Sequence, residues 1–311
     1  MEKFYYKGSN GRTDIAAYAW FPDGEIKGLI YFAHGIMEYA ERHSKFFELL
    51  TNEGYCVIAN DHMGHGDSQA IFPMFFDGRI GISGWNCACN DAYLCIYTCR
   101  KKFNISRDIP LYGMGFSLGS FIVQTVAIRN PTLFTGGLIL LSTGNQNPIK
   151  TNLGKILALH EAHRYGIANT TPQVSKWTIK SFNKHFGGRT IADWFCLNRR
   201  SLQKYLDDDR CGKEITAGLL YDVLDGIEYT SNFFNIKQMD SRMPILILAG
   251  SRDPVGDFGK GVRRVEAGMK KAGISNVEVH LLPGGRHDIF HEIQSGCTEK
   301  GIHLIINWLK V

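Results

Sequence analysis

The sequence predicts an α/β fold in which helices cover both faces of a mostly parallel, twisted sheet. Short apolar runs alternate with segments of helical periodicity along most of the chain, which is the pattern of repeated strand–helix–strand units. Between Asn145 and about Asp240 this alternation stops, and helical segments follow one another without a convincing strand. A helical insertion between two strands is expected to lie over the carboxyl edge of the sheet as a lid, where ligands of such sheets gather.

The expected strands and helices follow from local pattern. Apolar strands, rich in aliphatic and aromatic residues, are expected over residues 15–21, 29–35, 55–61, 107–113, 136–142, 243–250 and 276–285. Between and after them, helices are expected over residues 41–54, 90–103, 118–130, 260–273 and 303–311. Inside the insertion, helices are expected over residues 153–166, 174–186, 191–206 and 214–227.

Length and composition predict a soluble protein with one core and one insertion. We assign residues 1–144 and 236–311 of the 311-residue chain to the α/β core and residues 145–235 to the lid. The net charge of +5 comes without a long basic run, so no nucleic-acid partner is expected. No charged-then-apolar leader begins the chain and no apolar run reaches membrane-spanning length, which predicts a cytoplasmic location.

The cysteines predict neither a disulfide scaffold nor a metal site. Cys56 lies in an expected strand and Cys95 and Cys99 on an expected helix, so buried free thiols are expected. The group from Cys87 to Cys99 lacks the paired C-x2-C spacing of zinc sites. The run HEAH, residues 160–163, is one residue short of a zinc helix and is expected to face solvent. No metal and no organic cofactor are therefore expected.

The run GFSLGS contains the first candidate for catalysis, Ser117. It lies where the strand over 107–113 turns into the helix over 118–130, and Gly115 and Gly119 leave the turn free of side chains. Such a turn exposes a serine hydroxyl above the edge of the sheet, next to a helix N-terminus, as in the G-x-S-x-G nucleophile elbow. The alternative is an ordinary tight turn with a capping serine.

A serine nucleophile needs a base and an acid that orients the base. Asp253 and Asp257 both follow the strand over 243–250, and His287 follows the strand over 276–285. Asp253 is preferred as the acid because Asp257 is expected to cap the helix that begins near Lys260. We prefer His287 as the base on its loop position.

Two further histidines are alternatives for the base. His280 lies within the strand over 276–285 and is expected to pack under a helix, and His291 is expected on a helix face. The tetrahedral oxyanion needs two N–H donors, for which we expect the backbone of Leu118 and of Ile36. Gly35 lets the chain turn before Ile36, and His34 is expected to brace that loop.

The chain resembles the monoacylglycerol lipase and bacterial lysophospholipase group of the α/β-hydrolases. The resemblance rests on the runs HGIMEYAERH, DHMGHGDS, GFSLGS, GSRDPVG and PGGRHDIFHE, in that order along the core, and on the lid run DWFCLNRRSLQKYLDDDRCG. It implies the α/β-hydrolase fold, with Ser117 as nucleophile, Asp253 as acid and His287 as base. It also implies Ile36 and Leu118 as oxyanion donors. The chain departs from the group at Phe116 and Met63, where histidine and arginine are usual.

A carboxylic-ester hydrolase that acts on monoacylated lipids is the function we expect. The insertion is rich in aromatic residues, and an acyl pocket is expected from Phe116, Trp177, Trp194 and Phe195. The expected partners are a small acyl ester and, transiently, a membrane or lipid aggregate. Three alternatives stay open: a peptidase like the proline iminopeptidases, using carboxylates such as residues 207–209, an acyltransferase with the same triad, and a non-catalytic receptor for an apolar ligand.

Overall fold

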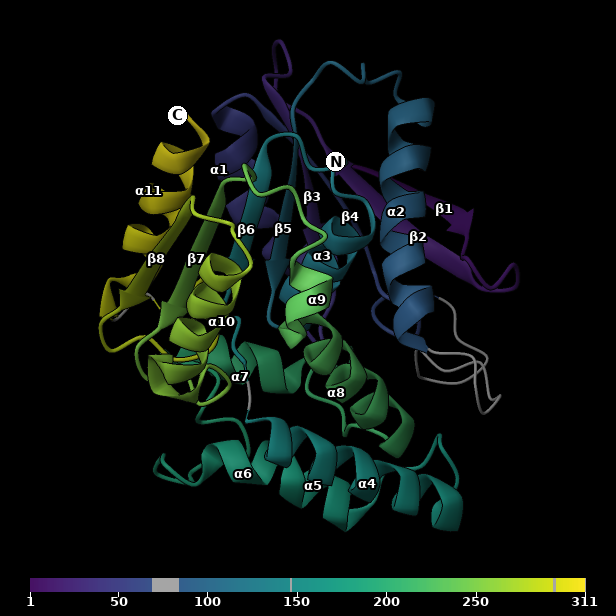
Figure 1. Ribbon diagram of the computed structural model, residues 1–311, viewed down its shortest axis with the longest axis vertical. Coiled ribbons are helices and arrows are strands. Elements are labelled where there is room, and N and C mark those ends of the chain that lie inside the picture. Colours follow the sequence, from purple (N-terminus) through teal and green to yellow (C-terminus); the bar gives the residue numbers. More distant parts are fainter. Residues whose placement is uncertain (69–83, 146, 293–294, 311) are drawn as a thin grey trace.

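The computed structural model describes residues 1–68, 84–145, 147–292 and 295–310, and these residues form an eight-stranded sheet of order β1-β2-β4-β3-β5-β6-β7-β8 (Figure 1). From β4 to β8 neighbouring strands are parallel, and β1 and β2 form an antiparallel edge. The mostly parallel sheet that the sequence predicts is confirmed. The strands are β1 (Glu2–Lys7), β2 (Asp14–Trp20), β3 (Gly28–Ala33), β4 (Tyr55–Asn60), β5 (Leu111–Phe116), β6 (Gly137–Leu141), β7 (Ile245–Gly250) and β8 (Val277–Leu282).

Helices cover both faces of this sheet, and each face has its own apolar core. One face carries α2 (Gly84–Lys102), α3 (Leu118–Arg129) and α10 (Lys260–Lys271), and the other carries α1 (Ser44–Asn52) and α11 (Cys297–Leu309) (Figure 1). Because side chains alternate along a strand, Leu29 and Tyr31 enter the first core while Ile30 and Phe32 enter the second. Two short 3-10 helices, Ala40–His43 and Asp257–Gly259, lie in loops.

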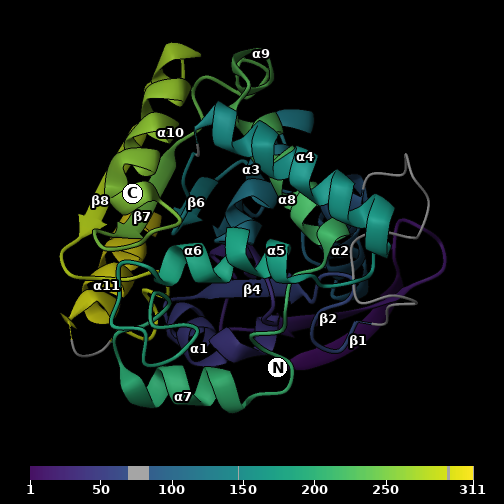
Figure 2. The ribbon, with the colours of Figure 1, turned by 90° about the horizontal axis from the view of Figure 1, so that it is seen from below.

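The chain between β6 and β7 supplies a layer of helices at one end of the sheet. Seen from below, α4, α5, α6 and α7 extend across that end (Figure 2), while α8 contacts both α4 and the core helices α2 and α3. The assignment of residues 145–235 to a separate lid subdomain stays a prediction. These helices are α4 (Pro148–Tyr165), α5 (Pro172–Trp177), α6 (Ile179–Asn183), α7 (Arg199–Asp207), α8 (Ala217–Ser231) and α9 (Phe233–Ile236).

Several elements differ from the expectation: α9 was not expected, the helix expected over 174–186 is divided into α5 and α6, and the strand expected over 107–113 is β5, three to four residues later. Two further differences have a clear local cause. β1 was not expected, because its alternation of exposed and half-buried residues is typical of an edge strand and gives a weak apolar signal. The helix expected over 191–206 begins only at Arg199, after Asn198 caps it by accepting the Ser201 N–H at 3.0 Å. The preceding residues form a loop because the Asp193 carboxylate accepts hydrogen bonds from Arg189 N–H and the Thr190 hydroxyl.

All eight cysteines are free and buried, as expected. Among the residues that the structure describes, no three or more His, Cys, Asp or Glu side chains are grouped as metal ligands would be. None of the described helices combines the length and the apolar character that a membrane crossing needs.

The junction of β5 and α3 is packed so closely that two of its positions must be glycine. A Cβ atom on Gly119 would lie 1.9 Å from the Ala33 carbonyl oxygen of β3, and one on Gly115 would lie 2.2 Å from the Gly119 carbonyl oxygen. Both obstacles are backbone atoms of buried elements, which cannot move aside as the end of a flexible side chain can. The sheet and its central helix therefore fix the position of the residue between them, Ser117.

We predict that Gly119→Ala lowers the free energy of unfolding by about 3 kcal/mol or more, because the new methyl group overlaps the β3 backbone. Gly268→Ala is the matched control: it also lies in a helix, α10, but its new Cβ would approach nothing closer than 3.6 Å. That control should be neutral or gain up to about 1 kcal/mol from helix propensity. Chemical denaturation of both variants measures this, and equal stabilities would contradict it.

Candidate active site

Ser117 lies at the apex of the turn between β5 and α3 in a strained backbone conformation. Its φ and ψ are 52° and −116°, and residues other than glycine rarely adopt this backbone conformation. The turn is held by the Ser117 N–H, which donates to the Leu141 carbonyl at 2.9 Å, and by the Ser120 hydroxyl, which donates to the Ser117 carbonyl at 2.6 Å. Strain that the surrounding structure maintains in this way is typical of functional positions.

The structure brings Ser117, His287 and Asp253 together in one hydrogen-bonded chain. His287 Nε2 lies 2.8 Å from Ser117 Oγ, and its Nδ1 lies 2.9 Å from Asp253 Oδ2. Because an ionised carboxylate only accepts, Nδ1 carries the proton and Nε2 is left to accept from the serine hydroxyl. Ser117, His287 and Asp253 are 7 %, 2 % and 0 % exposed, so this chain is shielded from bulk water.

The loops that follow β7 and β8 position the acid and the base. A Cβ on Gly250, the last residue of β7, would lie 2.2 Å from the carbonyl oxygens of Gly285 and Arg286, so the two loops touch. The second oxygen of Asp253, Oδ1, accepts the Val255 N–H at 2.9 Å, and the His287 carbonyl accepts the Ser142 hydroxyl at 2.6 Å. Both side chains therefore have fixed orientations.

Asp257 does not cap α10, and the expectation that it would is wrong. Gly259, in the left-handed conformation, occupies the position before α10, and Asp257 lies two residues earlier with φ of 50°. Its carboxylate is partly exposed and accepts from Arg264 Nη2 at 2.9 Å. Of the two candidate acids, the structure brings Asp253 to His287.

The other two histidines considered as bases lie away from the reacting chain and also differ from expectation. His280 is not packed under a helix: it is half-buried on β8, with Nε2 2.5 Å from Glu278 Oε1. His291 is not on a helix face but in a bend, with Nδ1 2.9 Å from Asp288 Oδ2. Each is held by a carboxylate on its own segment, close in the sequence.

The two residues expected to donate to the oxyanion lie at the start of α3 and in the turn after β3. Leu118 is the first residue of α3, and Ile36 lies in the turn after β3. Within the described part of the chain, neither backbone N–H donates to another residue, so both are available to a ligand. A Cβ on Gly35 would lie 2.9 Å from Glu38 Oε1, and that oxygen accepts the Gly35 N–H at 2.6 Å. This contact fixes the turn before Ile36.

His34 braces the same turn from the other side. Its Nε2 accepts the His62 N–H at 2.9 Å, so the proton resides on Nδ1, which donates to the Gly35 carbonyl at 2.7 Å. Burial and the neighbouring His62 and His65 hold the pKa of His34 well below its ordinary value. The ring is therefore neutral, in the one tautomer that these contacts allow.

A buried ion-pair network connects the oxyanion turn to the histidine loop, and the sequence reasoning missed it. Arg42 Nη1 lies 2.8 Å from Glu38 Oε2, and Nη2 lies 2.5 Å from Asp288 Oδ2. Burial alone would raise the pKa of Asp288, but Arg42 and His291 lower it well below its usual range. Glu38 and Arg42 lie in the run HGIMEYAERH and Asp288 directly follows His287, but no local pattern in the sequence pairs the two runs.

Three of the four expected pocket residues surround His287. The ring centroids of Phe116 and Trp194 both lie 5.2 Å from that of the imidazole, and that of Phe195 lies at 5.9 Å. Trp177 instead packs on α4, where a Cβ on Gly154 would lie 2.9 Å from its indole nitrogen. The imidazole is thus enclosed by aromatic rings from the core and from the insertion.

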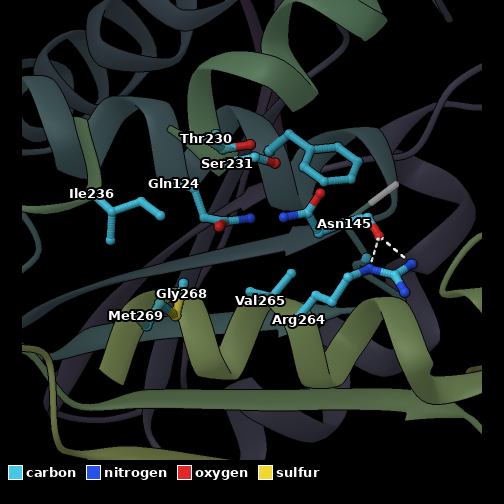
Figure 3. A pocket seen from close by; sticks show the side chains of 11 residues that line it. Gln124, Asn145, Thr230, Ser231, Ile236, Arg264, Val265, Gly268 and Met269 are labelled. Atoms are coloured by element: carbon cyan, nitrogen blue, oxygen red, sulfur yellow. Dashed lines mark hydrogen bonds between the residues drawn. The ribbon is translucent and has the colours of Figure 1, made fainter. Parts of the chain in front are cut away.

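A separate crevice lies between α3, α10 and the chain around α8 and α9 (Figure 3). Its volume of about 20 Å³ suits a single water molecule, and none of Ser117, His287 and Asp253 lines it. At one side Arg264 Nε and Nη2 donate to the Asn145 carbonyl at 2.9 and 2.7 Å. Arg264 therefore anchors the chain just before the insertion begins.

Relatives of known function match nearly the whole chain. The mouse (Mus musculus) monoglyceride lipase is 24 % identical, with 93 % of this chain and 84 % of the relative covered. The human (Homo sapiens) monoglyceride lipase is 27 % identical over 90 % of this chain and 86 % of its own, and a Monkeypox virus monoglyceride lipase homolog is 23 % identical over 88 % and 86 %.

Solved structures share the fold. A carboxyl esterase from Bacillus coagulans superposes with a TM-score of 0.84 at 20 % identity, covering 99 % of this chain and 98 % of its own. A monoglyceride lipase from Saccharomyces cerevisiae superposes with a TM-score of 0.73 at 18 % identity, covering 99 % and 94 %. The α/β-hydrolase fold implied by the resemblance is confirmed.

The sequence family described as "Serine aminopeptidase, S33" matches residues 24–294, which is most of the chain and includes strands β3 to β8 and the insertion. The match spans the loops that carry Ser117, Asp253 and His287. The chain belongs to this family of α/β-hydrolases and is a serine hydrolase.

Proposed function

We propose that the chain hydrolyses carboxylic esters of monoacylated lipids with Ser117 as nucleophile, His287 as base and Asp253 as orienting acid. The observation that carries the proposal is the hydrogen-bonded chain from Ser117 Oγ through the imidazole to Asp253, with distances of 2.8 and 2.9 Å. Nucleophile, base and acid in this order and at these distances form the arrangement of serine hydrolases on several unrelated folds.

The geometry suits a two-step reaction through an acyl-enzyme. Ser117 Oγ attacks the ester carbonyl carbon while its proton passes to His287 Nε2, and the Asp253 carboxylate stabilises the imidazolium. The N–H groups of Ile36 and Leu118 bind the oxyanion. Nε2 then gives the proton to the departing alcohol oxygen. Water, deprotonated by Nε2, attacks the acyl group, and Ser117 regains its proton.

Asp208 of the insertion does not suit an amine-binding role. An aminopeptidase needs a free carboxylate to bind the amino group of its substrate, and Asp208 already has other partners. Its Oδ2 accepts the Tyr39 hydroxyl at 2.6 Å, and Arg210 Nε lies 3.6 Å from its Oδ1. The rings of Phe116 and Phe195 beside His287 instead suit an apolar acyl group. The monoglyceride lipase relatives point to the same substrate class.

The outer face of α4 suits contact with a lipid surface. Ile149, Leu153, Ile156 and Leu159 are each more than half exposed, and their spacing puts them on one side of the helix. The helix lies at the outer side of the insertion (Figures 1 and 2). Its one acidic residue, Glu161, is buried, so this face is apolar with cationic ends and complements an anionic lipid surface.

We predict that Ser117→Ala lowers ester turnover by roughly three to six orders of magnitude, because the attacking oxygen is lost. A fluorophosphonate probe should label the wild-type chain at Ser117 and leave this variant unlabelled. Ser231→Ala is the matched control: this serine of α8 donates to the Ile227 carbonyl at 2.6 Å, away from Ser117, and its variant should still be labelled. Persistent labelling of the Ser117→Ala variant would contradict the assignment of Ser117 as the nucleophile.

We predict that Asp253→Asn lowers kcat by about 10³- to 10⁴-fold while the fold survives, because an amide favours the wrong imidazole tautomer. Asp257→Asn should lower kcat less than about tenfold. Asparagine tolerates the left-handed conformation, and loss of the exposed pair with Arg264 costs at most about 1 kcal/mol. Measured kcat and Tm of both variants test this, and the reverse ranking would assign the acid to Asp257.

We predict that the double variant Ile149→Ser, Ile156→Ser binds vesicles of phosphatidylcholine and phosphatidylglycerol about tenfold more weakly, because two apolar side chains no longer enter the interface. Its turnover of a water-soluble short-chain ester should not change. Phe234→Ser, which removes a 74 % exposed side chain from α9, is the control and should bind as the wild type does. Equal binding by all three proteins in co-sedimentation would exclude α4 as the contact.

A further inference from the structure

Trp194 carries an unsatisfied hydrogen-bond donor beside the reacting groups. Its indole nitrogen is sealed from solvent and has no acceptor among the described residues. Its ring centroid lies 5.2 Å from that of His287, with the two planes at 43°. Trp85 also has an unpaired indole N–H, but its ring packs against Gly226 of α8. Of these two, Trp194 alone adjoins the imidazole.

A buried N–H without an acceptor costs free energy unless a ligand satisfies it. The rings around Trp194 offer no strong acceptor, since Phe182 and Phe195 lie at centroid distances of 5.1 and 5.6 Å. The His287 carbonyl already accepts from Ser142. An oxygen atom of a bound substrate is therefore the partner that the site lacks.

The loop that carries Trp194 is fixed to the histidine loop. The Asp288 N–H donates to the Phe195 carbonyl at 2.8 Å, and the Leu197 N–H donates to Glu292 Oε1 at 2.8 Å. The backbone N–H of Trp194 donates to Asn183 Oδ1 at 3.1 Å. The indole is thus held in place relative to the imidazole before any substrate arrives, which is what a specificity contact requires.

The position beside His287 selects one part of the ester. The carbonyl oxygen turns toward the Ile36 and Leu118 N–H groups, while the alcohol oxygen faces Nε2 of His287, which protonates it on departure. The Trp194 ring packs on the imidazole that protonates this oxygen, so the alcohol portion is the part of the substrate that we assign to its N–H.

We infer that Trp194 Nε1–H donates a hydrogen bond to a hydroxyl oxygen of the alcohol portion of the substrate. This inference rests on the proposed function and names Trp194 as a specificity-determining residue for it. The site selects esters whose alcohol carries a further hydroxyl, such as glycerol esters, over esters of simple alkanols with the same acyl chain.

The test compares Trp194→Phe with the wild type on two esters that share their acyl chain, 1-decanoylglycerol and ethyl decanoate. Phenylalanine keeps an aromatic body and removes the N–H. For the glycerol ester kcat/KM should fall about three- to tenfold, the range that a net hydrogen bond of 0.7–1.4 kcal/mol represents. For the ethyl ester it should change less than about twofold. Trp177→Phe, which alters a tryptophan of the insertion packed on α4, should change neither value.

Every outcome of this comparison either supports or overturns the inference. An equal fall for both esters, or no fall for either, would overturn the inference, because the indole then either serves only to pack or contacts an atom that both substrates share. The Tm and the rate of fluorophosphonate labelling identify a variant that is misfolded. In that case Trp194→Leu, which keeps an apolar side chain and brings no hydrogen-bond donor, is measured on the same ester pair with the same expectation. Failure of the wild type to turn over either ester would count against the proposed function instead.

Discussion

The arrangement of the candidate site depends on the buried ion pairs that the guanidinium of Arg42 forms with two carboxylates. It joins Glu38, which fixes the turn before Ile36, to Asp288, which follows His287, the proposed base. Its plane also lies over the rings of Phe195 and Tyr205 in the insertion, at 5.4 and 5.2 Å. Removing one partner of such a buried pair typically costs about 3–5 kcal/mol, because a charge is left without compensation. One side chain thereby holds the oxyanion turn, the base and the insertion in a common geometry.

The sheet supplies the rest of the precision. The three hydrogen-bonded residues are far apart in the sequence: Ser117 lies 170 residues from His287, and Asp253 lies 34 residues from it. Each nevertheless follows a parallel strand, at the same end of the sheet. Parallel neighbours bring their carboxyl ends together, so a short loop after each strand suffices to place a side chain within hydrogen-bond reach. The strained backbone of Ser117 is tolerated because α3 and β3 enclose it, and no side chain could be added at Gly119.

Much of this could be predicted from sequence, because strand ends and the glycine pattern around Ser117 are local signals. The pairing of Arg42 with Asp288 could not, since 246 residues separate them and only the folded sheet makes them neighbours. The loop around Trp194 was expected to be helical, because its apolar periodicity continues into α7, and the hydrogen bonds of Asp193 that stop the helix are not visible in periodicity. The prediction for Asp257 was wrong for a related reason. A carboxylate shortly before a helix suggests an N-cap, but the N-cap position of α10 is occupied by Gly259 in the left-handed conformation.

The contacts that fasten residues 193–197 to the histidine loop use mostly main-chain atoms of the insertion. Arg286 donates to the carbonyls of Asp193 and Cys196, and the Phe195 carbonyl and Leu197 N–H also take part. The Cys196 thiol adds one side-chain contact, to the His291 carbonyl. The side chains at positions 194 and 195 take no part in these contacts and project toward the imidazole instead. A substitution at either position therefore changes the surroundings of the imidazole while the main-chain anchoring of the loop persists. Attachment of the loop and the chemistry of the surface that it presents to His287 are thus separable.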